Sequence, residues 1–219
     1  MIKMKKYILF DLDGTLTDPA EGIIKSIKYS LEKLEFNDYD ESILTQFIGA
    51  PLAKAYGKYF GFDEEKSKLA VSLYREYFNV TGIFENYVYD GIPELLEKLH
   101  ADGYTLAVAT LKPTGAAKRI LEHFDLAKFF TLVEGSDPNK TNEGKADIIA
   151  NAISALNIED KSVAVMTGDR EHDMLGSSQN GIDSIGVLYG YGSREEVTNA
   201  GAKMIAETAA DVYDLIKNN

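Results

Sequence analysis

Three short apolar runs, each followed by a small or acidic polar residue, constrain the fold of this sequence more than any other feature. The runs are YILF before Asp11, YTLAVA before Thr110 and SVAVMTG before Asp169. Near-continuous apolar strands that alternate with helical segments are typical of a parallel sheet with helices on both faces. The sequence therefore predicts an α/β fold with an open, Rossmann-like parallel sheet.

The segments between these runs carry helix signals. GIPELLEKLHADG places Pro93 in a first turn and Gly103 just past the end, and HDMLGSSQNG closes on Gly181. A helical stripe runs from Ile148 to Leu156. SIGVLYG then reads as another strand and ETAADVYDLIKN as a final helix.

Between Thr17 and about Asn86 the pattern changes, because helical spacing replaces strand-like runs. At about 150 residues per domain, a chain of 219 residues accommodates one domain plus a sizeable insertion. We therefore predict a core domain from 1–16 and 87–219 and a helical domain, 17–86, inserted after the first strand. The apolar positions behind this insertion are Ile23, Ile24, Ile27, Leu31 and Leu34 in one helix and Leu69, Leu73, Tyr77 and Phe78 in another.

Composition limits the partners and the location. A net charge of -12 and a pI near 4.7 oppose a basic footprint for nucleic acid polymers. The sequence holds no cysteine, which fits a reducing compartment. Asp11 interrupts the first apolar run, and no apolar stretch is long enough for a membrane span. We expect a cytoplasmic protein.

Four polar residues should converge at one edge of the sheet. Ligands of open α/β sheets bind beyond the carboxyl ends of the strands, where Asp11, Thr110 and Asp169 stand. Asp173 lies one helical turn after Asp169. Carboxylates that converge without a cation repel each other, and oxygen ligands without Cys or clustered His favour Mg²⁺. We predict a Mg²⁺ site here.

The same residues suit phosphoryl transfer. A carboxylate such as Asp11 can attack phosphorus as a covalent nucleophile. Asp13, two residues later, can protonate the leaving oxygen and then deprotonate water. Thr110 offers a hydroxyl and Lys145 an ammonium for the phosphoryl oxygens.

The motifs also resemble those of a known family. DLDGT with a helical insert after it, VAT followed by KP, a lysine before a helix, and GDREHD are similar to the four motifs, in order, of the haloacid dehalogenase-like phosphatases. The resemblance covers nearly the whole chain. It is strongest to the phosphoglycolate phosphatase-like branch with an α-helical cap, through DGTLTDPAEGI, GAPL and GVLYGYGSREEVTNAGA.

The resemblance implies a role for each matching residue. Asp11 would be the nucleophile and a metal ligand. Asp13 would be the general acid/base and would give its backbone carbonyl to Mg²⁺. The remaining implied roles are phosphoryl binding by Thr110 and Lys145, with Lys145 also steadying Asp11, and Mg²⁺ ligation by Asp169 and by Asp173, the latter directly or through water.

Some positions leave alternatives open. Leu111 stands where relatives often carry a polar residue, which would alter the substrate side of the pocket. Lys140 competes with Lys145 for the phosphate-binding role. His172 lies between two acids of its motif, and its helical phase predicts that it points away from both. The aromatic residues of the insertion could stack a nucleobase, but their spacing favours a core: Tyr56, Tyr59, Phe60, Tyr74, Tyr77 and Phe78.

We therefore expect a Mg²⁺-dependent phosphatase of small phosphomonoesters, phosphoglycolate phosphatase-like, working through an aspartyl-phosphate. The alternatives are a 5'-nucleotidase, a phosphosugar mutase, a phosphonate hydrolase using Lys54 or Lys58, or a non-catalytic metabolite-binding module. A dehalogenase is disfavoured, since Asp13 would have no task in it. We expect a small phosphorylated metabolite as partner, no nucleic acid polymer, no membrane, and a monomer or weak homodimer.

Overall fold

The computed structural model describes residues 5–137, 140 and 144–218, and within it the chain forms two compact units. The larger unit joins Met1–Thr17 to Val88–Asn219, and the smaller unit is Asp18–Tyr87. The predicted core segments include residues outside the described ones, namely 1–4, 138–139, 141–143 and 219. Treating the units as a core domain and an inserted domain stays a prediction.

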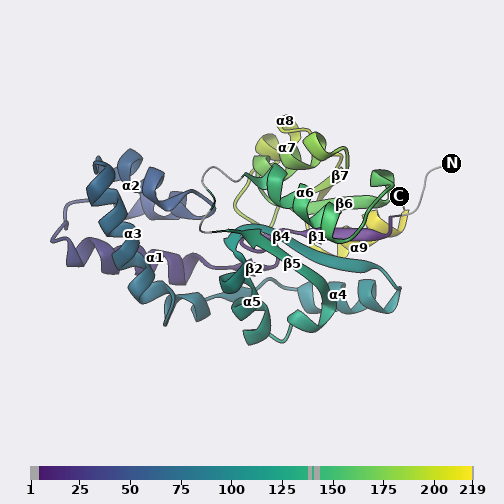
Figure 1. Cartoon of the computed structure of the whole chain (residues 1–219), viewed down its shortest axis with the longest axis horizontal. Coiled ribbons are helices and arrows are strands. Elements are labelled where there is room, and N and C mark those ends of the chain that lie inside the picture. The colour runs from purple at the N-terminus through teal and green to yellow at the C-terminus, as the bar shows by residue number, and fades with distance from the viewer. Residues whose placement is uncertain (1–4, 138–139, 141–143, 219) are drawn as a thin grey trace. The chain divides into compact units, whose positions relative to one another are not determined.

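The larger unit is built on a six-stranded sheet in which every pair of neighbouring strands is parallel, so the predicted Rossmann-like α/β fold is confirmed. Figure 1 shows these strands side by side. From one edge to the other they are β5 (Phe130–Ser136), β4 (Thr105–Pro113), β1 (Tyr7–Phe10), β6 (Ala164–Gly168), β7 (Asp183–Val187) and β8 (Met204–Ala206).

The burial of the strands matches their place in the sheet. The central strands β1 and β6 have both faces covered, and Ile8, Leu9 and Phe10 are wholly buried. This explains why their sequences are continuous apolar runs. Two outer strands, β5 and β8, have no such run and are not among the predicted strands.

Helices cover both faces of this sheet, as predicted (Figure 1). On one face α6 packs against α7, and α8 lies beside α7; on the other, α4 packs against α9, and α5 contacts β4 and β5. The helices are α4 (Ile92–Ala101), α5 (Thr114–His123), α6 (Lys145–Ala155), α7 (Glu171–Asn180), α8 (Arg194–Asn199) and α9 (Ala209–Asn218).

The core beneath α6 explains two sequence features. The stripe from Ile148 along α6 is buried against β1, β4 and β6, as its spacing predicts. Leu111 packs against this same cluster, so its side chain contributes to the core. The predicted left-handed cap of α7 at Gly181 is confirmed by its φ of 70°. No helix in the described ranges is long and apolar enough to cross a membrane.

The smaller unit is helical, as its spacing predicts, with α1 (Ala20–Lys33), α2 (Leu52–Phe60), α3 (Glu64–Phe78) and two 3₁₀ helices (Glu41–Phe47 and Gly82–Phe84). Short strands β2 (Thr17–Asp18) and β3 (Tyr87–Val88) pair with each other. On α3 the predicted stripe is wrong at Leu69, which is 51% exposed. The buried face of α3 instead runs through Ser67, Ala70, Tyr74 and Phe78, because small residues let α3 approach α1 and α2.

Aromatic rings form the core of the smaller unit. Tyr56 is fully buried, donates to or accepts from Ser30 Oγ, and lies edge-on to Phe47 with ring centres 5.1 Å apart. The expected structural role of these aromatics therefore fits their packing. The rings in mutual contact are Phe36, Tyr39, Phe47, Tyr56, Tyr59, Phe60 and Phe62.

Candidate active site

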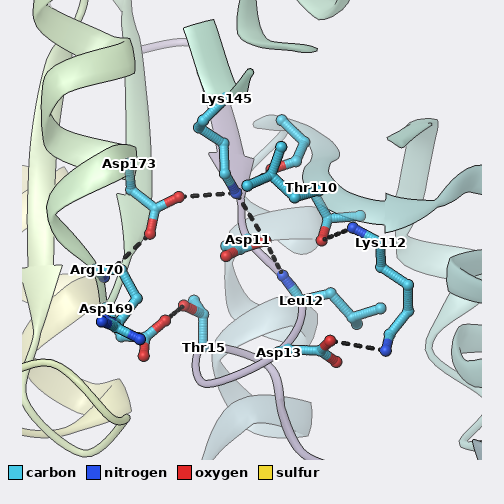
Figure 2. Close-up of polar contacts among 12 residues, drawn as sticks. Asp11, Leu12, Asp13, Thr15, Thr110, Lys112, Lys145, Asp169, Arg170 and Asp173 are labelled. Carbon is cyan, nitrogen blue, oxygen red and sulfur yellow. Dashed lines mark hydrogen bonds and ion pairs between the residues drawn. The ribbon is translucent and has the colours of Figure 1, made fainter. Parts of the chain in front are cut away.

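Strand register brings the predicted site residues to one edge of the sheet. Phe10 of β1 lies opposite Val108 of β4 on one side and Thr167 of β6 on the other. Asp11, Thr110 and Asp169 follow these positions by one or two residues and therefore gather beyond the carboxyl ends of three neighbouring strands. Figure 2 shows their side chains in one region of the larger unit.

Asp11 is a buried residue that makes hydrogen bonds with neighbouring backbone groups and contacts the ammonium of Lys145. Its backbone N–H donates to Thr167 O at 2.9 Å, and Leu12 N–H donates to its Oδ1 at 2.8 Å. Lys145 Nζ lies 2.8 Å from the same Oδ1. Burial by itself would raise the pKa of Asp11, but the charge and hydrogen bond of Lys145 outweigh it and lower that pKa. Asp11 is therefore ionised near neutral pH.

Lys145 begins helix α6 and points into the site (Figure 2). Its side chain is buried, its ammonium lies 2.8 Å from Asp11 Oδ1 and 2.8 Å from Asp173 Oδ1, and it donates to Ala109 O at 3.0 Å. Burial would lower the pKa of Lys145, yet the two carboxylates raise it. Lys140, the alternative considered for the same role, is exposed.

Asp13 faces a lysine that the motif reading did not single out. Lys112 Nζ lies 2.7 Å from Asp13 Oδ2, with the two side chains 7% and 16% exposed. The other oxygen, Oδ1, is buried and has no hydrogen-bond partner among the described residues. Burial raises the pKa of Asp13, against the opposing charge of Lys112. The pKa values of Asp11 and Asp13 are thus shifted in opposite directions, although the two residues are only two positions apart in the sequence.

Thr110 and Lys112 lie near each other at the end of β4. Thr110 is buried, and its Oγ1 accepts a hydrogen bond from Lys112 N at 3.2 Å. Side chains two residues apart on a strand point to the same face. The hydroxyl of Thr110 and the ammonium of Lys112 therefore come from the same side of β4.

Asp169 follows β6 and is wholly buried. Thr15 Oγ1 donates to its Oδ1 at 3.2 Å, and Tyr191 N–H donates to its Oδ2 at 2.9 Å. Burial, and then the charges of Asp173 and Asp11, raise the pKa of Asp169 to about 7. Such a carboxylate binds a proton or a cation readily.

Three glycines allow the chain to close around Asp169. A Cβ at Gly14, whose φ is 83°, would lie 2.3 Å from Asp169 Oδ2. A Cβ at Gly190 would lie 2.2 Å from Gly14 O, and one at Gly192 would lie 1.8 Å from Asp169 O. These glycines belong to DGT and to YGYG, so the second motif serves the site as well as a turn.

Asp173 and His172 sit in the first turn of α7. Asp173 Oδ2 accepts a hydrogen bond from Arg170 N at 3.1 Å, and burial raises the pKa of Asp173 in spite of Lys145. One ligand atom each of Asp11, His172 and Asp173 lies within 4.8 Å of the others. The expectation that His172 points away from Asp169 and Asp173 is therefore wrong for Asp173, because side chains lean toward the start of a helix and α7 begins at the site.

The donor set fits a divalent cation. Four carboxylates from Asp11, Asp13, Asp169 and Asp173 meet in a region where burial raises the pKa of three of them, Asp13, Asp169 and Asp173. Asp169 is not part of the group formed by Asp11, His172 and Asp173, whose ligand atoms lie within 4.8 Å of one another. The charges of Asp11 and Asp173 nevertheless raise the pKa of Asp169. A bound cation would offset the burial and mutual repulsion that raise these pKa values, and it would compete with protons for the carboxylates.

Sequence reasoning missed Lys112 and the contacts of Tyr191. Lys112 had a signal, since it stands two residues after Thr110 and so on the same side of the strand. The Tyr191 contact is made by a backbone N–H, which no side-chain pattern reveals. The only sequence signal for this contact is the pair of glycines on either side of Tyr191, which permit the backbone to approach Asp169 closely.

Comparisons with known proteins show the family and the relatives to which this chain is similar. The haloacid dehalogenase-like hydrolase family matches residues 8–187. A 5'-nucleotidase from Pseudomonas aeruginosa is 46% identical over 190 residues, 87% of this chain and 86% of that protein. The crystal structure of a predicted phosphatase from Clostridium acetobutylicum has a TM-score of 0.91 at 47% identity, covering 99% of this chain and 100% of that one. A phosphoglycolate phosphatase from Colwellia psychrerythraea is 26% identical over 99% of both chains.

Proposed function

We propose that this chain, which belongs to the haloacid dehalogenase-like hydrolases, is a Mg²⁺-dependent phosphatase that hydrolyses small phosphomonoesters through an aspartyl-phosphate on Asp11. One observation carries the proposal. Surroundings lower the pKa of Asp11 and raise that of Asp13. Carboxyl groups whose pKa values are pushed apart in this way supply an ionised nucleophile and a protonated acid within one site.

The first half-reaction transfers the phosphoryl group to the protein. An Asp11 carboxylate oxygen attacks phosphorus, and the bond from phosphorus to the ester oxygen breaks. Asp13 gives its proton to that departing oxygen, so an alcohol leaves. The buried Oδ1 of Asp13, which has no hydrogen-bond partner among the described residues, is the atom available for this transfer.

The second half-reaction returns the site to its starting state. Asp13, now ionised, takes a proton from water while the water oxygen attacks phosphorus. The bond from phosphorus to the Asp11 oxygen breaks, releasing phosphate and restoring the Asp11 carboxylate. Asp13 is then protonated again.

Thr110 and Lys145 are suited to hold the transferring group. The Thr110 hydroxyl and the Lys145 ammonium offer hydrogen-bond donors beside Asp11, and stabilisation of the charge on the phosphoryl oxygens is the main requirement of such a reaction. Lys145 also holds Asp11 Oδ1 in place. Mutual contact with Asp173 keeps its ammonium directed into the site.

Mg²⁺ would be held by the side chains of Asp11, Asp169 and Asp173 and by the backbone carbonyl of Asp13. When bound, it supplies positive charge that neutralises the carboxylates and the phosphoryl oxygens. The residues fit this ion because their ligand atoms are oxygens. His172, whose ring nitrogen lies near Asp11 and Asp173, adds a donor that Mn²⁺ also accepts.

For the substrate we propose a 5'-nucleotide first and 2-phosphoglycolate second. The relative at 46% identity is named as a 5'-nucleotidase, and the relative named as a phosphoglycolate phosphatase is 26% identical. The rings of the smaller unit pack against one another, so base stacking on buried Tyr56 or Tyr74 has no support. Selectivity would come from other residues.

We propose a core domain and a cap domain along the predicted boundaries, a cytoplasmic location, and a monomer or weak homodimer. A phosphosugar mutase would return the phosphoryl group to its substrate. A non-catalytic binding module would have no use for an acid/base group such as Asp13 between Asp11 and Lys112.

A substrate panel tests the proposal. Phosphate release should be measured with and without Mg²⁺ on 5'-nucleotides, 2-phosphoglycolate, sugar phosphates and a phosphodiester. We expect Mg²⁺-dependent hydrolysis of monoesters, with the first two classes in the upper ranks. A diester hydrolysed faster than every monoester would overturn the substrate class, and retention of the phosphoryl group on a sugar would favour the mutase.

A further inference from the structure

We propose that Lys112 is a positioning residue for Asp13. It holds Oδ2 of Asp13 so that Oδ1 remains the atom that exchanges a proton with the leaving oxygen and with water. This inference rests on the proposed function, because it needs Asp13 to act as the acid/base group.

The two oxygens of Asp13 have different surroundings. Oδ2 lies 2.7 Å from the Lys112 ammonium, whereas Oδ1 is buried with no hydrogen-bond partner in the described parts of the chain. A carboxylate rotates about its terminal bond with little preference, so its two oxygens are interchangeable unless a neighbour fixes one of them. Lys112 is that neighbour, and Figure 2 shows its ammonium reaching Asp13 from β4.

Lys112 is itself held by the strand that carries it. β4 continues to Pro113, beyond the last residues that pair with β1, and Lys112 N–H donates to Thr110 Oγ1. Thr110 and Lys112 share one face of the strand. The proposed phosphoryl-binding hydroxyl and the ammonium that holds the acid therefore move as one piece.

The end of β5 fixes the backbone of this stretch. Ser136 Oγ donates to Leu111 O at 2.8 Å, and Thr114 Oγ1 donates to Gly135 O and accepts from Gly135 N at 3.1 Å each. A Cβ at Gly135 would lie 2.4 Å from Lys112 O. Only glycine lets β5 approach Lys112 so closely, and this close packing leaves its main chain little freedom.

Loss of the Lys112 ammonium should change the position of the Asp13 carboxyl group without removing that group. Correct placement matters strongly for proton transfer, and a shift of about 1 Å can cost about 100-fold in rate. In kcat/KM, which covers the steps up to departure of the alcohol, the cost should appear only where the leaving oxygen needs a proton. A nitrophenolate leaves readily without one, whereas a benzyl alkoxide does not.

The experiment compares two phosphate monoesters of the same charge and almost equal size, p-nitrophenyl phosphate and p-nitrobenzyl phosphate. Their kcat and KM are measured for the wild type, Lys112→Met, Lys112→Arg, Asp13→Asn and the double variant Asp13→Asn/Lys112→Met. Lys128→Met is the matched control, because it removes a lysine that pairs with an aspartate at the exposed surface of the same unit.

We expect Lys112→Met to lower kcat/KM for the benzyl ester about 10- to 100-fold and for the phenyl ester less than about 3-fold. Lys112→Arg should recover most of the loss. In the Asp13→Asn background, Lys112→Met should add little, because both changes act through one group. Lys128→Met should behave as the wild type.

Equal losses of kcat/KM on the two esters, or additive effects in the double variant, would overturn the inference. If Lys112→Met does not fold, the same comparison with Lys112→Gln and Lys112→Arg still tests the inference. A wild type that hydrolyses neither ester, or an Asp13→Asn variant as active as the wild type on both, would instead remove the proposed function and, with it, the role of Lys112.

Discussion

Lys145 Nζ lies 2.8 Å from Asp11 Oδ1, in a contact where the two side chains are only 1% and 8% exposed. The pair joins the start of α6 to the end of β1. A buried ion pair gives little net stability over an apolar pair, but loss of one partner leaves a charge without compensation. Here the loss of Lys145 would leave Asp11 and Asp173 facing each other.

Replacement of Lys145 tests this relationship. We expect Lys145→Met to lower the free energy of unfolding by about 3–5 kcal/mol at pH 7 without metal, because two buried carboxylates lose their shared cation. The measurement is urea unfolding in EDTA, with the exposed Lys118→Met as control. An unfolding midpoint equal to that of the wild type would contradict the role of the ion pair.

Asp11 and Asp13 should lose activity to different extents. Asp11→Asn should have no detectable turnover, since an amide is not an anionic nucleophile. Asp13→Asn should fall by about 10² to 10⁴, the usual contribution of a general acid/base group. Phosphate release measures both, and thermal melting checks that each variant is folded. Full activity in either folded variant would refute the mechanism.

Asp169 should give the metal-free protein a pH-dependent stability. Its folded pKa is raised to about 7, above an unfolded value of about 4. The proton is therefore bound more tightly in the folded state. The resulting stability is present below pH 4 and is lost as the pH rises through about 7, for a total of up to about 4 kcal/mol.

The variant Asp169→Asn isolates this contribution. Urea unfolding in EDTA between pH 4 and pH 8 should show the wild type losing stability with rising pH more steeply than the variant. Subtracting the two curves removes the effect of the other titrating groups. Parallel curves would mean that Asp169 titrates at its ordinary pKa.

Mg²⁺ should raise the melting temperature of the wild type, because it binds the folded carboxylates and not the unfolded chain. Asp169→Ala should abolish most of this rise, and it should also relieve repulsion in the metal-free protein. Asp183→Ala, outside the site, offers a control for the loss of an aspartate on the sheet. An unchanged response to Mg²⁺ in Asp169→Ala would place the metal elsewhere.

Gly192 should tolerate no side chain. Its Cβ would lie 1.8 Å from Asp169 O, so Gly192→Ala should displace the loop that donates to Asp169 and weaken the response to Mg²⁺. Gly115→Ala is the matched control, because nothing lies within 4 Å of its Cβ position and it stands inside α5. Alanine there should be neutral or stabilise by up to about 1 kcal/mol. Equal melting temperatures for the two variants would contradict the packing argument.

The sequence predicted the parts of the site that follow from strand ends. Asp11, Thr110 and Asp169 each terminate an apolar run, and parallel strands place such ends at one edge of the sheet, where the adjacency of β4, β1 and β6 brings them together. His172 was predicted wrongly because helical phase describes the middle of a helix, whereas His172 lies in the first turn. The burial of Leu69 was predicted wrongly for another reason, because the helices that pack against α3 decide which of its faces is buried.

The central position of β1 has a consequence for the order in which the site can form during synthesis. Its two neighbours in the sheet, β4 and β6, begin at Thr105 and Ala164. At about 5–20 residues per second, roughly 8–30 s separate translation of Asp11 from that of Asp173. The smaller unit, continuous from Asp18 to Tyr87, can fold within that interval. β1, apolar on both faces, must wait, and is the segment of the nascent chain that most needs protection from aggregation.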